Sequence, residues 1–220
     1  MAVLITRRAF GAAAAGAAAL VLAGCERGGG VSGVAGESGA VPRARFNAID
    51  ITGANYGREL ALPDADGRAR TLADFRGKFV VLFFGFVHCP DVCPTKLMEI
   101  AEARRLLGPD GERVQGVFVT VDPERDTPEV LRAYMAKFDP SFIALRGNAE
   151  QTRQVAREFR VFYAKAPGPT PTSYSIDHTA GSYVIDAQGR LRLFTRYGSG
   201  AAVLAHDLRL LLAEGRGLQD

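Results

Sequence analysis

The sequence has no tryptophan, and it has only three histidines and three cysteines in 220 residues. Three cysteines cannot form the framework of a disulfide-rich domain, so each one can be weighed separately. Charge of one sign is not in excess either. The 27 Lys and Arg residues face 24 Asp and Glu, and a net charge of +3 gives no case for a nucleic-acid partner.

The composition is that of a folded protein. Hydrophobic residues make up 47% of the chain and charged residues 23%, with 25 glycines and 11 prolines. These proportions exclude a fully disordered chain, a collagen and a coiled coil. The length suits one ordinary domain with appendages.

Residues 1–24 have the pattern of an export signal. Arg7 and Arg8 precede an apolar run from Gly11 to Leu22, which has signal-peptide length and is too short to cross a bilayer. The run ends in Leu-Ala-Gly-Cys25, which resembles a bacterial lipobox, a motif whose cysteine is lipidated and starts the mature protein. The paired arginines also resemble a twin-arginine export motif. The alternative is an ordinary secretory signal whose cleavage falls near a cysteine.

These features predict a protein on the periplasmic side of a bacterial membrane, anchored through a lipid on Cys25. The stretch from Glu26 to Arg45 holds six Gly, two Ser and one Pro but no aromatic residue, so it predicts a flexible tether. The expected organisation is therefore a signal peptide at 1–24, a lipidated cysteine and tether at 25–45, and one domain at 46–220.

The domain alternates between strand and helix patterns. Residues 78–87 and 114–122 are almost continuously apolar, as parallel strands buried on both faces are. Residues 183–194 read as an antiparallel hairpin around Ala-Gln-Gly189. Helices are expected at 96–107, 126–138, 148–159 and 202–212. This order predicts an α/β sandwich of thioredoxin type, with a central mixed sheet flanked by helices and a terminal β-hairpin.

The chemistry is concentrated where the first long strand leads into a helix, at His88-Cys89-Pro-Asp-Val-Cys93-Pro. Cys89 and Cys93 are four residues apart, a spacing that places both side chains on one helix face. The pair suits either a disulfide or two thiolates on one metal ion. A helix N-terminus also favours the thiolate form. The plainer interpretation is a pair of buried structural thiols.

His178 can complete a set of three donors. It lies just before the predicted terminal hairpin, in a loop that approaches the cysteine-bearing helix in a thioredoxin-type fold. Two thiolates and one imidazole suit a soft monovalent cation, above all Cu(I), whereas zinc usually takes a fourth ligand. The alternative for His178 is a surface or capping histidine.

Several neighbouring residues are weaker candidates. His88 is expected to be structural because adjacent side chains diverge. Asp122 ends a strand at the same sheet edge, where it either tunes the site through a neighbouring contact or caps the turn at Pro123. Asp91 is expected to be solvated, His206 to lie on the surface, and Met98 and Met135 to fill the core.

Three motifs together resemble the Sco/SenC family. They are the cysteine segment from Gly85 to Thr95, the segment Val121-Asp-Pro-Glu-Arg-Asp-Thr-Pro128, and Asp177-His178-Thr179. The resemblance covers roughly residues 59–212. It implies a thioredoxin-like, membrane-tethered copper protein that takes part in building the CuA centre of cytochrome c oxidase. It also implies that Cys89, Cys93 and His178 are the copper ligands. Many relatives use a transmembrane anchor where this chain has a lipobox.

Two functions from different classes follow. The first is a metallochaperone that passes copper to the copper-bearing oxidase subunit or exchanges it with other copper chaperones. The second is an enzyme, a thiol-disulfide reductase that uses Cys89 and Cys93 to reduce cysteines of an oxidase subunit. His178 discriminates between them, because metal binding requires it and disulfide exchange does not. No nucleic-acid partner is expected.

Overall fold

The computed structural model describes residues 45–168, 170 and 173–216. The predicted signal peptide, Cys25 and nearly all of the predicted tether lie outside these residues. In the part of the chain that is described, no helix is both long and apolar enough to cross a membrane.

A six-stranded mixed sheet forms the centre of the domain, with strand order β1-β10-β9-β4-β5-β6. Strands β4, β5 and β6 run parallel, while β9 pairs antiparallel with both β4 and β10. Every residue of β4 and β5 is buried, as their apolar sequences require. The strands are β1 Ile49–Asp50, β4 Phe79–Gly85, β5 Val114–Thr120, β6 Ile143–Leu145, β9 Ser182–Ile185 and β10 Leu191–Thr195.

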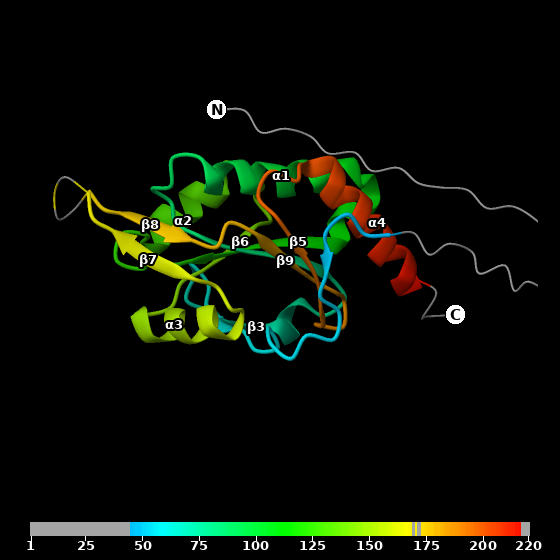
Figure 1. Ribbon diagram of the computed structural model, residues 1–220, viewed down its shortest axis with the longest axis horizontal. Coiled ribbons are helices and arrows are strands. Elements are labelled where there is room, and N and C mark those ends of the chain that lie inside the picture. Colours follow the sequence, from blue (N-terminus) through cyan, green and yellow to red (C-terminus); the bar gives the residue numbers. More distant parts are fainter. Residues whose placement is uncertain (1–44, 169, 171–172, 217–220) are drawn as a thin grey trace, which may run out of the picture. The chain divides into compact units, whose positions relative to one another are not determined.

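Four α-helices cover the two faces of this sheet. Helices α1, α2 and α4 lie on one face and α3 on the other, so the sheet is enclosed between two helical layers (Figure 1). They are α1 Val92–Leu106, α2 Pro128–Met135, α3 Ala149–Glu158 and α4 Ala201–Arg216, with short 3-10 helices η1 Leu72–Phe75 and η2 Gly108–Arg113. The arrangement confirms the predicted thioredoxin-like fold, including the terminal hairpin β9–β10.

Two small hairpins lie outside the central sheet. One joins β2 (Ala61–Pro63) to β3 (Ala69–Thr71), and the other joins β7 (Tyr163–Ala166) to β8 (Ser175–His178). The β7–β8 hairpin projects beyond the end of the sheet (Figure 1). It was not among the predicted elements, although it carries His178.

The helix boundaries differ from the predicted ones chiefly in three helices. Helix α4 continues to Arg216, beyond the predicted end at Leu212. Helix α1 begins at Val92, before the predicted start at Lys96, so Cys93 lies in its first turn. Helix α2 ends at Met135 rather than Phe138. After Met135 the backbone N–H groups of Lys137 and Phe138 donate to carbonyls three residues back, at Tyr134 and Met135, so the chain continues in tighter turns than an α-helix.

The beginning of the domain is fixed to helix α4. The backbone N–H groups of Asn47 and Ala48 donate to the carboxylate of Asp207 over 2.9 and 2.7 Å. Asp207 is fully buried, so these bonds satisfy a charge that would otherwise be costly inside the protein. The chain then enters the sheet as β1, paired with β10.

Candidate metal centre

Cys89 and Cys93 lie at the carboxyl end of β4, where the chain turns into α1. The backbone N–H of Cys89 donates to the carbonyl of Phe86 (3.3 Å), which closes the turn. The backbone N–H of Cys93 donates to Sγ of Cys89 (3.4 Å). Cys89 therefore accepts from one of the free N–H groups at the start of the helix, as an N-capping side chain does.

The two thiols differ in exposure and in acidity. Cys93 is completely buried, whereas Cys89 is partly exposed, and the two are not joined by a disulfide. Hydrogen bonds from the Cys93 thiol and from His178 lower the pKa of Cys89 to about 3, against the opposing effect of burial. The neighbouring Cys89 thiolate and burial raise the pKa of Cys93. The pair thus holds its first negative charge on the accessible sulfur.

His178 reaches the cysteines from the end of β8. Its Nε2 lies 3.4 Å from Sγ of Cys93, and its Nδ1 lies 3.0 Å from the carbonyl oxygen of Thr179. A carbonyl only accepts hydrogen bonds, so Nδ1 carries a proton, and Nε2 is the ring nitrogen that faces the sulfurs. A backbone carbonyl on the far ring nitrogen is a common way to orient a metal-binding histidine.

The donor atoms of Cys89, Cys93 and His178 all lie within 4.8 Å of one another. Two sulfurs and one imidazole nitrogen form a soft donor set, and the group can bind copper. Among the described residues no fourth protein ligand joins them, as a closed structural zinc site would require. The structure therefore brings together all three residues that the sequence singled out, across 85 residues of chain.

Aromatic rings and a glycine shape the wall behind these donors. The rings of Phe83 and Phe86 contact the imidazole of His178, with centroids 5.9 and 5.8 Å away. At Gly85 an added Cβ would lie 2.7 Å from Sγ of Cys93 and 2.9 Å from the Phe118 ring. Only glycine at this position leaves room for the buried sulfur. Gly85 is the first residue of the cysteine motif, but nothing in the sequence indicated that it makes room for the sulfur of Cys93.

A polar cluster fastens the β7–β8 hairpin to the end of β5. Asp122, fully buried, accepts from Arg125 Nε (2.5 Å) and from the Tyr174 hydroxyl (2.7 Å). Arg125 also donates to the Tyr174 carbonyl (2.8 Å) and stacks over its ring at 3.7 Å. Asp122 therefore acts on the site through the hairpin that carries His178, with no bond to any of the three donors.

Asp126 stabilises the chain just before the cysteines, a role that was not predicted from the sequence. Its carboxylate is completely buried and accepts from the Thr120 hydroxyl (2.6 Å) and from the N–H of Val87 (3.1 Å). Burial raises the pKa of Asp126. In the sequence, Asp126 follows a strand and precedes the Thr-Pro pair that begins a helix. This position is typical of an ordinary turn residue, and nothing else in the sequence indicated its role.

The remaining candidates fall outside the donor group. The side chain of His88 is 56% exposed, and its Nδ1 lies 4.0 Å from a carboxylate oxygen of Asp126, so it is not part of the donor group. Asp91 is exposed as predicted, and His206 is about half exposed. Met135 is buried as predicted, but the prediction for Met98 was wrong, because it is 63% exposed on the outer face of α1.

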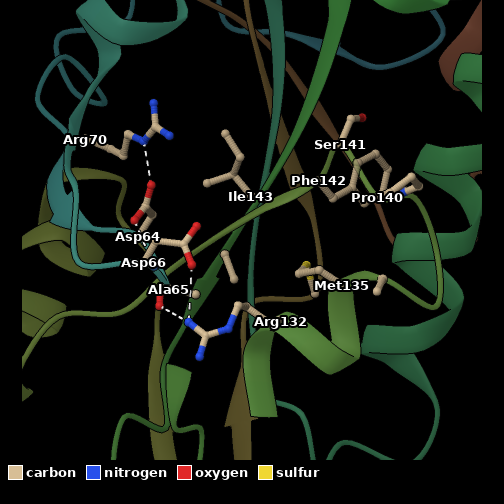
Figure 2. Close-up of a pocket in the computed structure, with 12 residues that line it drawn as sticks. Asp64, Ala65, Asp66, Arg70, Arg132, Met135, Pro140, Ser141, Phe142 and Ile143 are labelled. Atoms are coloured by element: carbon tan, nitrogen blue, oxygen red, sulfur yellow. Dashed lines mark hydrogen bonds and ion pairs between the residues drawn. The ribbon is translucent and has the colours of Figure 1, made fainter. Parts of the chain in front are cut away.

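A separate cavity of about 380 Å³ lies against strand β6. In Figure 2 the guanidinium of Arg70 points to Asp64, and that of Arg132 points to Ala65 and Asp66. The residues that line it include no cysteine and no histidine. Its arginines are engaged with their neighbours, so it is no candidate for binding a soft metal.

The fold and the site define a class of protein: a thioredoxin-like α/β domain with a two-cysteine, one-histidine metal centre at the end of its sheet. The sequence model of the SCO1/SenC family matches residues 50–213, and the chain belongs to this family. The family resemblance of the three motifs is thereby confirmed.

Individual relatives support the assignment. "Protein SCO2 homolog, mitochondrial" of Bos taurus is 43% identical over 145 residues, which are 65% of this chain and 53% of that protein. The corresponding Mus musculus protein is 40% identical, with 54% of its length covered. The chain thus matches about half the length of these curated relatives.

Two solved structures share the fold and much of the sequence. Bradyrhizobium japonicum ScoI with copper bound is 38% identical, with a TM-score of 0.65, and the match covers 71% of this chain and 99% of that one. Apo Sco1 from Thermus thermophilus is 40% identical, with a TM-score of 0.66 and coverage of 76% and 95%.

Proposed function

We propose that this protein is a copper metallochaperone that binds copper through Cys89, Cys93 and His178 and delivers it to the CuA site of cytochrome c oxidase. The observation that carries the proposal is the group of three soft donors within 4.8 Å. Membership of the SCO1/SenC family and the likeness to ScoI with copper bound support copper as the metal. The oxidase as recipient rests on the family resemblance.

The geometry suits transfer better than permanent storage. Cys93 is buried, but Cys89 is partly exposed, so an incoming ligand can approach a copper ion from the Cys89 side. Three protein donors leave Cu(I) open to a further ligand, and the ion can then pass from one set of thiolates to another by stepwise exchange. The thiolate character of Cys89 matters because the ligand must be deprotonated to bind.

The setting of this transfer is the periplasmic side of a bacterial membrane, with the domain of residues 46–220 held by a lipid on Cys25. The sequence of residues 1–24 and the lipobox ending in Cys25 support this placement. Replacing Cys25 by Ser should release the protein from the membrane fraction and leave copper stoichiometry unchanged. A Cys25→Ser protein that remains membrane-bound would contradict the lipid anchor alone.

The direct test is metal analysis of the purified full-length Cys25→Ser protein after anaerobic loading with Cu(I) and desalting. We expect copper to be retained in proportion to protein. Cys89→Ser and Cys93→Ser should lose it, and His178→Ala should hold it more weakly. His88→Ala is the matched control, because this exposed histidine adjoins Cys89 without belonging to the donor group. Absence of copper from the parent protein would overturn the proposal.

A thiol-disulfide reductase is the second candidate. The pKa of Cys89, lowered to about 3, favours it, because a thiolate at neutral pH is the form that attacks a disulfide. The two functions separate in cells grown at limiting copper. The metallochaperone requires His178, so His178→Ala should abolish oxidase activity while the purified variant still forms its disulfide. Full oxidase activity in that strain would favour the reductase.

A further inference from the structure

A groove of about 250 Å³ opens beside Cys89, and two of the three metal donors, Cys89 and His178, line it. One wall is formed by residues 89–92 of the cysteine segment, and the other by Ala180 and all four residues of β8, Ser175–His178. Side chains of a strand alternate between its two faces. One face of a strand would contribute only every second residue to a groove. Because all four residues of β8 line this groove, the strand presents its edge to it.

The register of the β7–β8 hairpin shows which backbone groups lie on that edge. The N–H of Thr179 donates to Phe162 of the β7 side (3.0 Å), while the carbonyl of Tyr174 accepts from Arg125, away from β7. Backbone groups of successive residues point to opposite sides of a strand. Odd-numbered residues of β8 thus face β7, and the even-numbered Ile176 and His178 face the groove.

These edge groups have no partner in the part of the chain that the structure describes. Strand β8 pairs with β7 alone, and no other hydrogen bond reaches the backbone of Ile176 or His178. Arg125 donates to the first edge carbonyl, at Tyr174, and the backbone groups of the next two edge residues have no partner among the described residues. Unpaired edge groups beside a groove are a template for an added strand.

The groove is also acidic. Asp91 and Asp177 are exposed on opposite walls. No lysine or arginine lines the groove to balance these charges. A segment with basic side chains on either side of its reactive residue would complement this field.

We propose that the groove binds an extended, cysteine-bearing segment of the acceptor protein as an added strand against β8, with basic side chains flanking the cysteine. This rests on the proposed function, because it names the segment that receives copper. The backbone of Ile176 and His178 fixes the register, and the acceptor sulfur then lies beside Sγ of Cys89. Recognition is therefore a property of the main chain and of charge, and it tolerates variation at the other side chains.

The test uses the synthetic peptide Lys-Val-Thr-Cys-Thr-Val-Lys, with its cysteine activated by thionitrobenzoate. The protein is the full-length Cys25→Ser, Cys93→Ser variant, in which Cys89 is the only thiol. The Cys89 thiolate attacks the peptide sulfur, forms a mixed disulfide and releases thionitrobenzoate, whose absorbance gives the rate. N-methylation then removes single peptide N–H groups, one position at a time.

Strand addition predicts an alternating result. Methylation at every second position should slow trapping about five-fold, the effect of one lost hydrogen bond, and methylation at the positions between should have little effect. Uniform effects, or none, would overturn the proposal. If the variant fails to fold, amide exchange of the Cys25→Ser protein with the Ser-for-Cys peptide replaces this measurement. Protection of the Ile176 and His178 amides is then expected, and its absence overturns the proposal.

The contribution of charge to binding in the groove is tested separately, with a control of its own. Asp177→Asn should slow trapping of the lysine-flanked peptide several-fold, most strongly at low salt, and should not slow a peptide with glutamine in place of both lysines. Glu112→Gln removes a similarly exposed carboxylate outside the groove and should change nothing. None of these measurements uses copper. A protein that traps the peptide in the alternating pattern but retains no metal would overturn the metallochaperone and leave the groove standing.

Discussion

The two halves of the metal centre are built in different ways. The sulfur half belongs to the core: Cys93 is fully buried in the first turn of α1, behind a strand in which every residue is buried. The nitrogen half, His178, is carried by a two-stranded hairpin outside the central sheet and held in place through Arg125 and Asp122. The site thus combines a fixed pair of thiols with a separately anchored imidazole.

This contrast predicts unequal losses when each half is removed. Cys93→Ser should abolish copper retention, because a serine hydroxyl is a poor ligand for Cu(I) and one soft donor is gone. His178→Ala should keep Cu(I) on the two thiolates with reduced affinity and should lose Cu(II) more severely. Competition with a Cu(I) chelator measures both variants. Equal losses of Cu(I) in the two variants would contradict the division into halves.

The next largest effect should follow from filling the space behind the sulfur. Gly85→Ala places a Cβ against Sγ of Cys93 and the Phe118 ring, and overpacking of this kind costs about 1–3 kcal/mol of unfolding free energy. Copper affinity should fall as well, because the thiol must move. Denaturant unfolding and chelator competition give the two quantities. Gly215→Ala is the control: its Cβ would meet nothing closer than 3.6 Å, and stability should not fall.

A more local effect is expected at the hairpin. Arg125→Met leaves the buried carboxylate of Asp122 without its cation and frees the carbonyl of Tyr174, at a cost of about 2 kcal/mol. Amide exchange should increase in β7 and β8 and remain unchanged in β4 and β5. His178-dependent copper affinity should fall while disulfide formation by the cysteines is preserved. Faster exchange throughout the sheet would show that the hairpin is not a separate unit.

The smallest effect concerns the acidity of Cys89. Its pKa is lowered chiefly by Cys93 and less by His178, so the thiolate persists as pH falls and is lost only near pH 3. Alkylation of Cys89 in the metal-free Cys25→Ser protein should therefore change little between neutral pH and about pH 4, where an ordinary thiol becomes unreactive. Cys93→Ala should raise the midpoint more than His178→Ala. The reverse order would assign the main electrostatic influence to the hairpin.

The sequence predicted the sulfur half more fully than the nitrogen half for a physical reason. Cys89 and Cys93 are close in the chain and follow a continuously apolar strand, so their proximity is a local property. His178 meets them only through the packing of the hairpin, and β7 and β8 have mostly exposed or half-buried residues and lack the apolar pattern by which strands are found. Its role was inferred from the fold type and the family resemblance.

The direction of individual side chains within α1 also could not be predicted from the local sequence pattern. Met98 was placed in the core because it is apolar, but Lys96 and Leu97 take the buried positions and Met98 faces solvent. Lys96 is buried because its amine binds Glu99 and the carbonyl of Arg196, a partner 100 residues away. The space that Gly85 leaves for Cys93 likewise depends on how the chain packs, so it could not be predicted from the spacing of residues in the sequence.

The attachment of Asn47 and Ala48 to Asp207 has a mechanical consequence. In the proposed anchored form, any pull from the membrane enters the domain at these residues and passes into α4 and into β1, at one edge of the sheet. Strands β10 and β9 separate β1 from β4, which leads into the cysteines. Load that enters the sheet is therefore applied at a strand separated from β4 by two others, whereas load on α4 acts on the helix that packs against α1, the helix of Cys93.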